Sequence, residues 1–255
     1  MKKVLFVFWH GLGDNILATP AIKKYKQTTG NYVGWMMMEK VKSAMIFEEY
    51  PYIDSMHYCS DAWHCCGREN LADGSLHVIK EAEVIKKRFG YDEVVVVNHR
   101  SSKKHKVYRT ADEMGVKIDD SEVKTEYFYD EESPRFEKWC SRYEIPDNFV
   151  FFHGKTSESS KDLPLKFVKD YMDSNNIRLP IVSPDFTWNV SDVPLAFSAH
   201  LLKRASHIIV SDSVIYHLAH ALDLNVDLAY FKRGEKTWNI VHPLHSNREK
   251  VIYSL

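Results

Sequence analysis

Short apolar runs alternate with segments of helical periodicity along the whole chain. In the first half, continuous apolar runs predict strands at residues 4–9, 33–38, 53–59 and 92–98. The spacing of apolar residues between them predicts helices at residues 15–26, 41–49, 76–89 and 108–114. The run of four valines at 94–97 is apolar at every position rather than at alternate positions. Such a run indicates a strand that is covered on both faces, as in a parallel α/β sheet.

The second half repeats this alternation. Its apolar runs predict strands at residues 149–153, 179–183, 207–212 and 226–231. Helical spacing predicts helices at residues 134–144, 164–174, 195–204 and 213–222. Two consecutive βα series predict an α/β fold of two Rossmann-like parallel-sheet domains that face each other across a cleft. An acidic linker-like stretch at 119–132 and the polar segment at 145–148 place the boundary between domains 1–146 and 147–255.

Composition limits the class of protein. The 255 residues are 44% hydrophobic and 27% charged, which is typical of a globular protein and excludes a disordered or coiled-coil chain. The net charge of −1 provides no global attraction to nucleic acid or to an anionic membrane. No apolar run has the roughly 18–20 residues that a membrane-spanning helix needs. The six-residue run at 4–9 is too short for a signal peptide, so we expect a cytoplasmic protein with free thiols.

The turn after the first predicted strand carries the first candidate chemistry. Gly11 and Gly13 permit a tight turn and a close approach of a ligand. Asp14 follows near the start of the next helix, at the strand end where open parallel sheets bind ligands. Its carboxylate is a candidate general base. The structural alternative is that Asp14 only caps the helix or interacts with the helix dipole.

Two polar segments of the second half form the other candidate site. Asp212 and Ser213 stand at a strand-to-helix turn, where the free N–H groups of the helix suit a phosphate. His217 follows one turn later and either faces the ligand or is a packed histidine. In the hydroxyl-rich loop at 153–164, Lys155 or Lys161 can reach a diphosphate as a point charge. A solvated surface turn is the alternative for this loop.

Five elements in order resemble glycosyltransferase family 9, the heptosyltransferases that build the inner core of lipopolysaccharide. They are the Gly-Asp and Thr-Pro pairs at 13–20, the Tyr-Pro-Tyr-Ile-Asp segment at 50–54, the Tyr-Asp strand start with the basic segment after it at 91–102, the Lys-Asp-Leu-Pro segment at 161–164, and the Asp-Ser helix start at 212–222. The family has the GT-B fold. This chain has Val214 where the family has glycine, and Leu163 where the family has tryptophan.

The resemblance implies an inverting, metal-independent transfer of a sugar from a nucleotide-diphosphate donor similar to ADP-heptose. Asp14 would be the general base that takes the proton of the acceptor hydroxyl. Lys161 and the N–H groups at Ser213 and Val214 would hold the diphosphate, and a helix N-terminus with a lysine can replace a metal in this role. The remaining donor-site residues would be Asp212, His217, Lys155 and Thr156. We expect no cofactor and no metal.

The segment at 99–109 holds five lysines and arginines and follows the valine-rich strand. It therefore borders the same strand-end edge as Asp14 and suits an acceptor that carries phosphate or carboxylate. The predicted acceptor-binding residues are His10, Gly13, Arg100, Lys103 and Lys104. A solvated helix face is the structural alternative. The cluster of His57, Cys59, His64, Cys65 and Cys66 lacks a Cys-x-x-Cys pair, so a zinc site is not predicted.

The sequence thus predicts a glycosyltransferase whose acceptor is an anionic glycan or a lipid-linked saccharide. A lipid-linked acceptor would place the protein peripherally at the inner face of the membrane. One alternative keeps the same chemistry with another acceptor, such as hydroxymethylated DNA. A second alternative is a nucleotide-sugar-binding protein without transfer activity. The oligomeric state is open.

Overall fold

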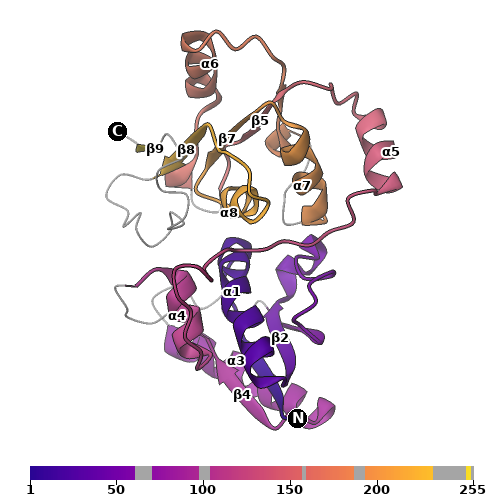
Figure 1. Cartoon of the computed structure of the whole chain (residues 1–255), viewed down its shortest axis with the longest axis vertical. Helices are drawn as coiled ribbons and strands as arrows, with labels where there is room; N and C mark the ends of the chain where they lie inside the picture. The colour runs from indigo at the N-terminus through magenta and orange to yellow at the C-terminus, as the bar shows by residue number, and fades with distance from the viewer. Residues whose placement is uncertain (61–70, 98–103, 157–158, 187–192, 232–250, 254–255) are drawn as a thin grey trace. The chain divides into compact units, whose positions relative to one another are not determined.

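The computed structural model describes residues 1–60, 71–97, 104–156, 159–186, 193–231 and 251–253 (Figure 1). At residues 71–76, 160 and 251–253 it describes the backbone only. The chain divides into two compact units, which are Met1–Glu126 (unit 1) and Tyr127–Leu255 (unit 2). Each unit is built on its own parallel sheet.

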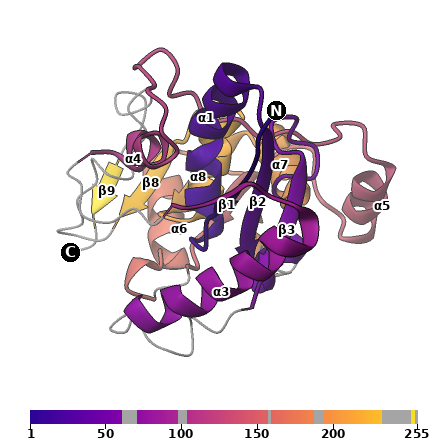
Figure 2. The ribbon, with the colours of Figure 1, turned by 90° about the horizontal axis from the view of Figure 1, so that it is seen from below.

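Unit 1 alternates strands and helices in the order β1 (Lys3–Val7), α1 (Leu12–Thr29), β2 (Tyr32–Met38), the 3-10 helix η1 (Glu39–Ala44), β3 (Ser55–Cys59), α3 (Leu71–Phe89), β4 (Glu93–Val96) and α4 (Lys106–Glu113). The strand order is β3-β2-β1-β4, and all three pairings are parallel. Right-handed crossovers that run in opposite directions along the sheet, from β1 to β2 through α1 and from β3 to β4 through α3, put their helices on opposite faces. Figure 2 shows α1 and α4 on one face and α3 on the other.

The central strand of unit 1 is buried on both faces. Every residue of β1 from Val4 to Val7 is at most 1% exposed. Val4 pairs with Val33 of β2 on one side and with Glu93 of β4 on the other. The predicted parallel pairing is confirmed for this sheet. The expected burial on both faces is found in β1 and β2, whereas the valines of β4 are only half-buried up to Val96.

The Thr19-Pro20 pair lies in the middle of α1, where a proline normally weakens a helix. Pro20 has no N–H to donate to the carbonyl of Ile16, and the Thr19 hydroxyl donates to that carbonyl instead, at 2.8 Å. The same hydroxyl accepts the backbone N–H of Glu126 at 3.0 Å, and Tyr50 donates its hydroxyl to the Thr19 carbonyl at 2.8 Å. These bonds satisfy the polar groups around the proline, so the helix continues for 18 residues.

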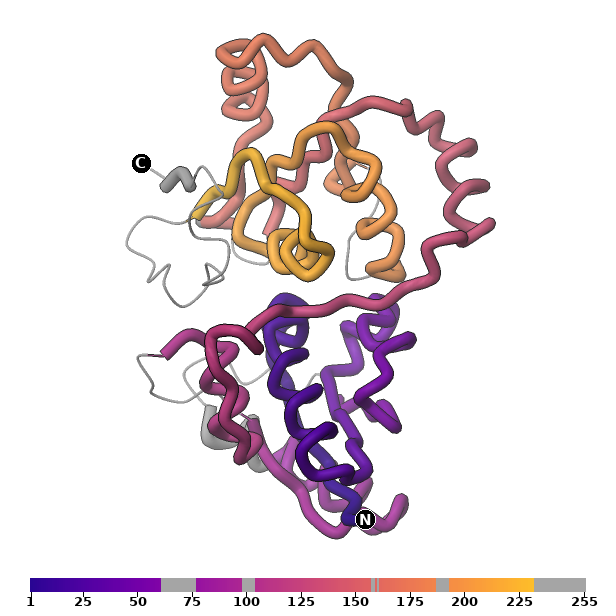
Figure 3. Tube along the Cα trace, in the orientation of Figure 1, coloured from indigo at the N-terminus to yellow at the C-terminus, as the bar shows by residue number. Residues whose placement is uncertain are grey.

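Unit 2 contains α5 (Pro134–Arg142), β5 (Val150–His153), the 3-10 helix η3 (Ser159–Lys161), α6 (Leu165–Ser174), β6 (Ile181–Val182), the 3-10 helix η4 (Pro184–Phe186), α7 (Leu195–Arg204), β7 (His207–Ser211), α8 (Val214–Ala221), β8 (Leu228–Phe231) and β9 (Val251–Tyr253). Figure 3 traces this path. The strand order is β6-β5-β7-β8-β9, again with parallel pairing throughout. The strand β9 was not predicted from the sequence.

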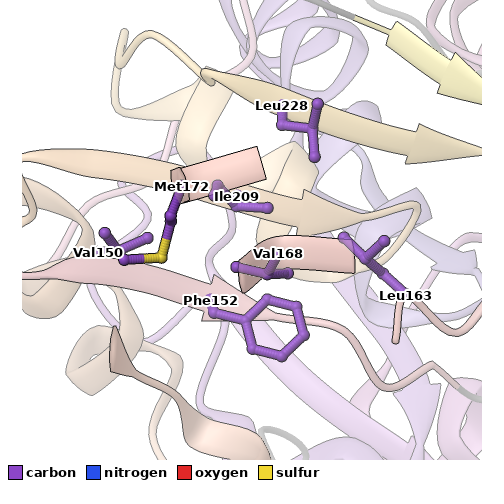
Figure 4. Close-up of a cluster of buried hydrophobic side chains, with 7 residues drawn as sticks. All are labelled: Val150, Phe152, Leu163, Val168, Met172, Ile209 and Leu228. Atoms are coloured by element: carbon purple, nitrogen blue, oxygen red, sulfur yellow. The ribbon is translucent and has the colours of Figure 1, made fainter. Parts of the chain in front are cut away.

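A cluster of buried side chains fixes α6 on the sheet of unit 2 (Figure 4). Val168 and Met172 of α6 pack among residues of β5, β7 and β8, and Leu163 of the preceding loop joins them. The sheet contributes Val150, Phe152, Ile209 and Leu228. Burying side chains of this size stabilises a fold by about 1.5–3 kcal/mol each. Because Leu163 belongs to this cluster, the loop before α6 is anchored near its end.

The division between the units falls after Glu126 rather than after residue 146. The helix α5, which the sequence assigned to the first domain, packs on α7 of unit 2. The ring of Phe136 lies 6.1 Å from that of Phe197, and Glu137 forms an ion pair with Arg204 at 2.7 Å. The acidic composition of the linker indicated that a boundary was near. It could not show that the helix after the linker buries its aromatic side chains in unit 2.

The predicted helix at 41–49 is wrong. The segment forms the short 3-10 helix η1, which ends at Met45 in the left-handed conformation with φ 49°. The residues that follow it, Ile46 and Phe47, are then buried, and the ring of Phe47 lies edge-on to Trp35 at 6.1 Å. Burial of these two side chains is the tertiary reason that helical spacing misled the prediction.

None of the helices within the described part of the chain is both long and apolar enough to cross a membrane.

Gly154, directly after β5, provides a test of packing. A Cβ at this position would lie 2.3 Å from Cζ of Phe152 and 2.4 Å from the backbone carbonyl of Leu163. We expect Gly154→Ala to lower the free energy of unfolding by about 1–3 kcal/mol because the strand end must shift. Chemical denaturation of the variant and the parent protein measures this change in the free energy of unfolding. Gly11→Ser is the control, since a Cβ at Gly11 meets nothing within 4 Å and serine is a good N-cap. Equal unfolding midpoints for the two variants would contradict this account.

Candidate active site

Asp14 lies in the first turn of α1, just beyond the carboxyl end of β1. Gly11 is the N-cap of this helix and has φ −63° and ψ 168°, an extended conformation that any residue adopts. The backbone conformation at Gly11 therefore does not require glycine, and the predicted close approach of a ligand stays a prediction. Gly13 lies within the helix. The turn presents Asp14 at the strand-end edge, as the sequence predicts.

Asn15 holds the turn in place from within the core. Its side-chain amide donates to the carbonyls of His10 and Gly11 at 3.2 and 2.9 Å. Its carbonyl oxygen accepts the indole N–H of Trp35 at 2.9 Å. Asn15 and Trp35 are both fully buried. A buried and satisfied amide of this kind fixes the backbone on which the neighbouring Asp14 stands.

Lys106, the first residue of α4, forms an ion pair with Asp14. Its Nζ lies 2.5 Å from Oδ1 of Asp14, and the two side chains are 30% and 18% exposed. The helix α4 is fixed against α1 by the packing of Val107 on Leu17. The positive end of α1 and the ammonium group both favour the charged carboxylate. Asp14 is therefore held as a carboxylate at the edge of the sheet, and a carboxylate can accept a proton.

His10 is the neighbour of this ion pair from the turn itself. Burial lowers the pKa of His10 below its usual range, Asp14 opposes that shift, and Lys106 adds to it. The imidazole is therefore neutral at pH 7. The ring contacts Phe8 and Trp9, with centroid distances of 4.8 and 6.2 Å. His10 and Gly13 thus closely precede Asp14 at the start of α1, and their role in acceptor binding stays a prediction.

The basic segment that follows β4 is described only from residue 104 onward. The predicted acceptor ligands Arg100 and Lys103 lie outside the described residues. Lys104 is exposed and forms an ion pair with Asp112 at 2.6 Å. Within the described part of this segment, Lys106 forms an ion pair with Asp14, and sequence reasoning gave it no role apart from that of the whole segment. Its place at a helix start next to Asp14 depends on tertiary packing.

In unit 2, Lys161 and Asp212 form a second, largely buried ion pair. The Nζ of Lys161 lies 2.7 Å from Oδ2 of Asp212, and the side chains are 17% and 7% exposed. Lys161 ends η3, and Asp212 follows β7 directly. The backbone N–H of Asp212 donates to the carbonyl of Tyr230 at 2.9 Å. The structure thus brings together two predicted donor-site residues that are far apart in the sequence.

The start of α8 joins this pair. Ser213 is the N-cap, and its hydroxyl accepts the N–H of Ile215 at 3.3 Å. That hydroxyl also lies 3.2 Å from Nδ1 of the buried His153 at the end of β5. Val214 is the first helical residue, and it has no positive φ that would require the glycine of the resembled family. His217 is buried in the same helix, with its ring 5.3 Å from that of Tyr216.

Three consecutive amides after β5 bind carboxylates of the protein. The N–H groups of Gly154 and Lys155 donate to Asp185 at 2.7 and 3.1 Å, and that of Thr156 donates to Asp162 at 2.7 Å. The Lys155 side chain is exposed. A phosphate would have to displace these carboxylates to use the loop amides. Lys161 is likewise paired with Asp212, so an anion at either place would replace a carboxylate of the protein.

Sequence reasoning assigned no role to Asp162, Asp185, His153 or Lys106. Asp162 and Asp185 are ordinary loop aspartates in the sequence, and only the fold brings their carboxylates to the loop amides. His153 ends a predicted strand, so its place at the ligand edge could have been found from that position. The segment with His64, Cys65 and Cys66 lies outside the described residues.

Comparison with known proteins was made for both the sequence and the structure. No protein-family model matches the sequence, and no curated protein matches it. Among solved structures, the chain is similar to a glycosyl transferase of family 9 from Veillonella parvula, with a TM-score of 0.66 and 15% identity over 99% of this chain and 86% of that one.

Two Escherichia coli proteins are similar to the same extent. The heptosyltransferase WaaC with ADP gives a TM-score of 0.62 and 14% identity, over 99% of this chain and 93% of that chain. The ADP-heptose lipopolysaccharide heptosyltransferase II gives a TM-score of 0.65 and 12% identity, over 99% of this chain and 90% of that chain. The fold is GT-B. The fold class expected from the resemblance is thereby confirmed, and likeness at this level of identity extends to the fold alone.

The buried His153 predicts a pH dependence of stability. Burial lowers the pKa of His153, and the nearby Asp185 opposes that shift. Below about pH 6.5 the unfolded chain binds a proton that the folded chain resists, so stability falls as the pH falls. We expect His153→Gln to reduce this slope by up to about 1.4 kcal/mol per pH unit. Denaturant unfolding of both proteins at pH 7.5, 6.5 and 5.5 measures the change of unfolding free energy with pH. Parallel pH profiles for the two proteins would contradict the assignment.

Proposed function

We propose that the chain is a glycosyltransferase that moves a sugar from a nucleotide-diphosphate donor to a hydroxyl group of an acceptor. The observation that carries the proposal is Asp14, a partly buried carboxylate held charged in the first turn after β1. Support comes from the fold, since the structures it is similar to include proteins named as glycosyltransferases.

Asp14 acts as the general base. As the acceptor oxygen bonds to the anomeric carbon of the sugar, its proton passes to the Asp14 carboxylate. The bond from that carbon to the diphosphate oxygen breaks, and its electron pair leaves with the nucleoside diphosphate. Attack from the side opposite the leaving group inverts the configuration of the anomeric carbon. Asp14 then returns its proton to the solvent.

Lys161 and the start of α8 hold the leaving diphosphate in this proposal. The diphosphate replaces Asp212 as the main partner of Lys161. It also accepts hydrogen bonds from the backbone N–H groups of Ser213 and Val214. These positive groups stabilise the charge that grows on the leaving group, so no metal is required. A donor similar to ADP-heptose is favoured, because one similar structure is named with ADP and another is named for ADP-heptose. His217, Lys155 and Thr156 complete the proposed donor site.

The proposed acceptor is an anionic glycan or a lipid-linked saccharide. His10, Gly13, Arg100, Lys103 and Lys104 are its proposed ligands. The described part of this set supports the proposal, since His10 and Gly13 closely precede Asp14 and the basic segment continues into Lys106 beside it. Lysine and arginine side chains in such a segment suit phosphate and carboxylate oxygens.

Asp14→Asn tests the base. The amide keeps the size of the side chain but cannot accept the proton, so we expect turnover to fall by a factor of about 10²–10⁴. Binding of the donor should be unchanged, because Asp14 belongs to unit 1 and the proposed donor ligands belong to unit 2. Release of nucleoside diphosphate measures turnover, and calorimetric titration with nucleotide sugars measures binding.

Two outcomes would contradict the Asp14 assignment. Turnover that survives the substitution would show that another group takes the proton. Donor binding without turnover in the parent protein, with an effect of Asp14→Asn on stability alone, would favour a binding protein without transfer activity.

Lys161→Met tests the donor site. Loss of a partly buried charged hydrogen bond to the diphosphate should weaken binding of a nucleoside diphosphate by about 10- to 100-fold without added metal. Lys166→Met is the matched control, because Lys166 is exposed and forms its ion pair with Asp170 of the same helix. Equal affinities for the two variants, measured by calorimetry, would place the diphosphate elsewhere.

A further inference from the structure

Lys106 reaches Asp14 from a rigid position. It is the first residue of α4, and its carbonyl accepts the Thr110 hydroxyl at 2.9 Å. The residue before it, His105, caps the helix by accepting the N–H of Val107 at its Nδ1. Val107 is fully buried against α1. The backbone at Lys106 is thus fixed on both sides, which limits the positions that its ammonium group can reach.

Lys106 and two histidines are among the titratable side chains at the starts of the two helices. On the helix start of Asp14 itself, His10 is neutral at pH 7 because burial lowers its pKa. On α4, the Nδ1 of His105 accepts a hydrogen bond and therefore carries no proton. The cation Lys106 forms an ion pair with Asp14 at 2.5 Å. Asp14 and Lys106 are both mostly shielded from water, so their attraction is screened less than that of the exposed pair between Lys104 and Asp112.

This ion pair has opposite effects on two properties of a general base. The ammonium group fixes the carboxylate in place and keeps it charged. It also lowers the tendency of the carboxylate to take up a proton, because proton uptake would leave the ammonium unpaired. A base works best when its affinity for a proton is matched to its task. The same contact therefore holds Asp14 ready and restrains it.

We propose that Lys106 is a positioning residue that restrains Asp14 at rest and releases it when an anionic group of the acceptor binds Lys106. This inference rests on the proposed function. The acceptor it selects carries a carboxylate or a phosphate a few bonds from the reacting hydroxyl. That anion takes the ammonium group as its partner, and the hydroxyl is delivered to the oxygen that the ammonium leaves. A neutral sugar cannot make this exchange, so Lys106 is a determinant of acceptor specificity.

The restraint can be measured without any acceptor. In protein labelled with ¹³C at aspartate carboxyl groups, the Asp14 signal is identified by its loss in Asp14→Asn and is followed through a pH titration. We expect the midpoint for Asp14 to rise by at least about 1 pH unit in Lys106→Met. Lys106→Arg keeps the cation and should retain the parent midpoint. Lys104→Met, which removes the cation paired with Asp112, is the matched control and should also retain it.

The release can be measured with simple anions. Inorganic phosphate and acetate are added separately, at an ionic strength kept constant with chloride. In the parent protein, the anion that takes Lys106 should move the midpoint of Asp14 upward, toward the value in Lys106→Met. The Lys106→Met protein should show no further movement. A larger shift of the Asp14 midpoint with phosphate than with acetate favours a phosphorylated acceptor, and a larger shift with acetate favours a carboxylated one.

The inference is overturned if the titration midpoint of Asp14 is the same in Lys106→Met, in Lys106→Arg and in the parent protein. It is also overturned if neither anion moves the midpoint, or if an anion moves it equally with and without Lys106. Circular dichroism of each variant separates these results from loss of folding. If Asp14→Asn abolishes turnover but Lys106 does not affect the titration, this inference alone fails. If the titration responds but Asp14→Asn leaves turnover intact, the proposed role of Asp14 as base fails.

Discussion

Parallel pairing of the strands is the constraint on which both units depend. All strand pairs in the described parts of the two sheets are parallel, so each strand must be followed by a crossover. Every crossover begins at the same edge of its sheet. In unit 1 the turn after β1 lies at that edge and leads to Asp14. In unit 2 the ends of β5 and β7 lie at the corresponding edge of their own sheet, with His153 and Asp212. The chemistry of each unit follows from this shared edge.

At each edge, a lysine from a helical segment distant in the sequence is paired with an aspartate that closely follows a strand. Lys106 pairs with Asp14 in unit 1, and Lys161 pairs with Asp212 in unit 2. Partly buried charges are costly unless they are paired, so each lysine stabilises the ligand-free form of its site. A substrate with its own anionic groups can replace the aspartate in either pair. In both candidate sites, an anionic ligand can therefore bind by replacing the aspartate as the partner of the lysine.

Local pattern predicted most elements because their cause is local. The helix at 195–204 has the bounds expected from its spacing. The uniform apolar runs became strands, of which β1 is buried and the valine-rich β4 is half-buried. The pattern failed where distant packing decides. Ile46 and Phe47 are drawn into the core and end η1 early, and Phe136 carries α5 into unit 2. Sequence spacing does not record which distant surface a side chain will meet.

The sequence by itself determined the fold class, the two βα series, the positions of Asp14 and Asp212 near predicted strand ends, and that of Lys161 in the loop after the predicted strand at 149–153. Only the tertiary structure decided which charges meet. Lys106 is 92 positions from Asp14 in the sequence and Lys161 is 51 from Asp212, and each pair forms because a helix or loop is packed against its sheet. Likewise, Asp162 and Asp185 bind loop amides that the sequence left open to a phosphate. Periodicity is a property of neighbouring residues, whereas an ion pair depends on how whole elements pack.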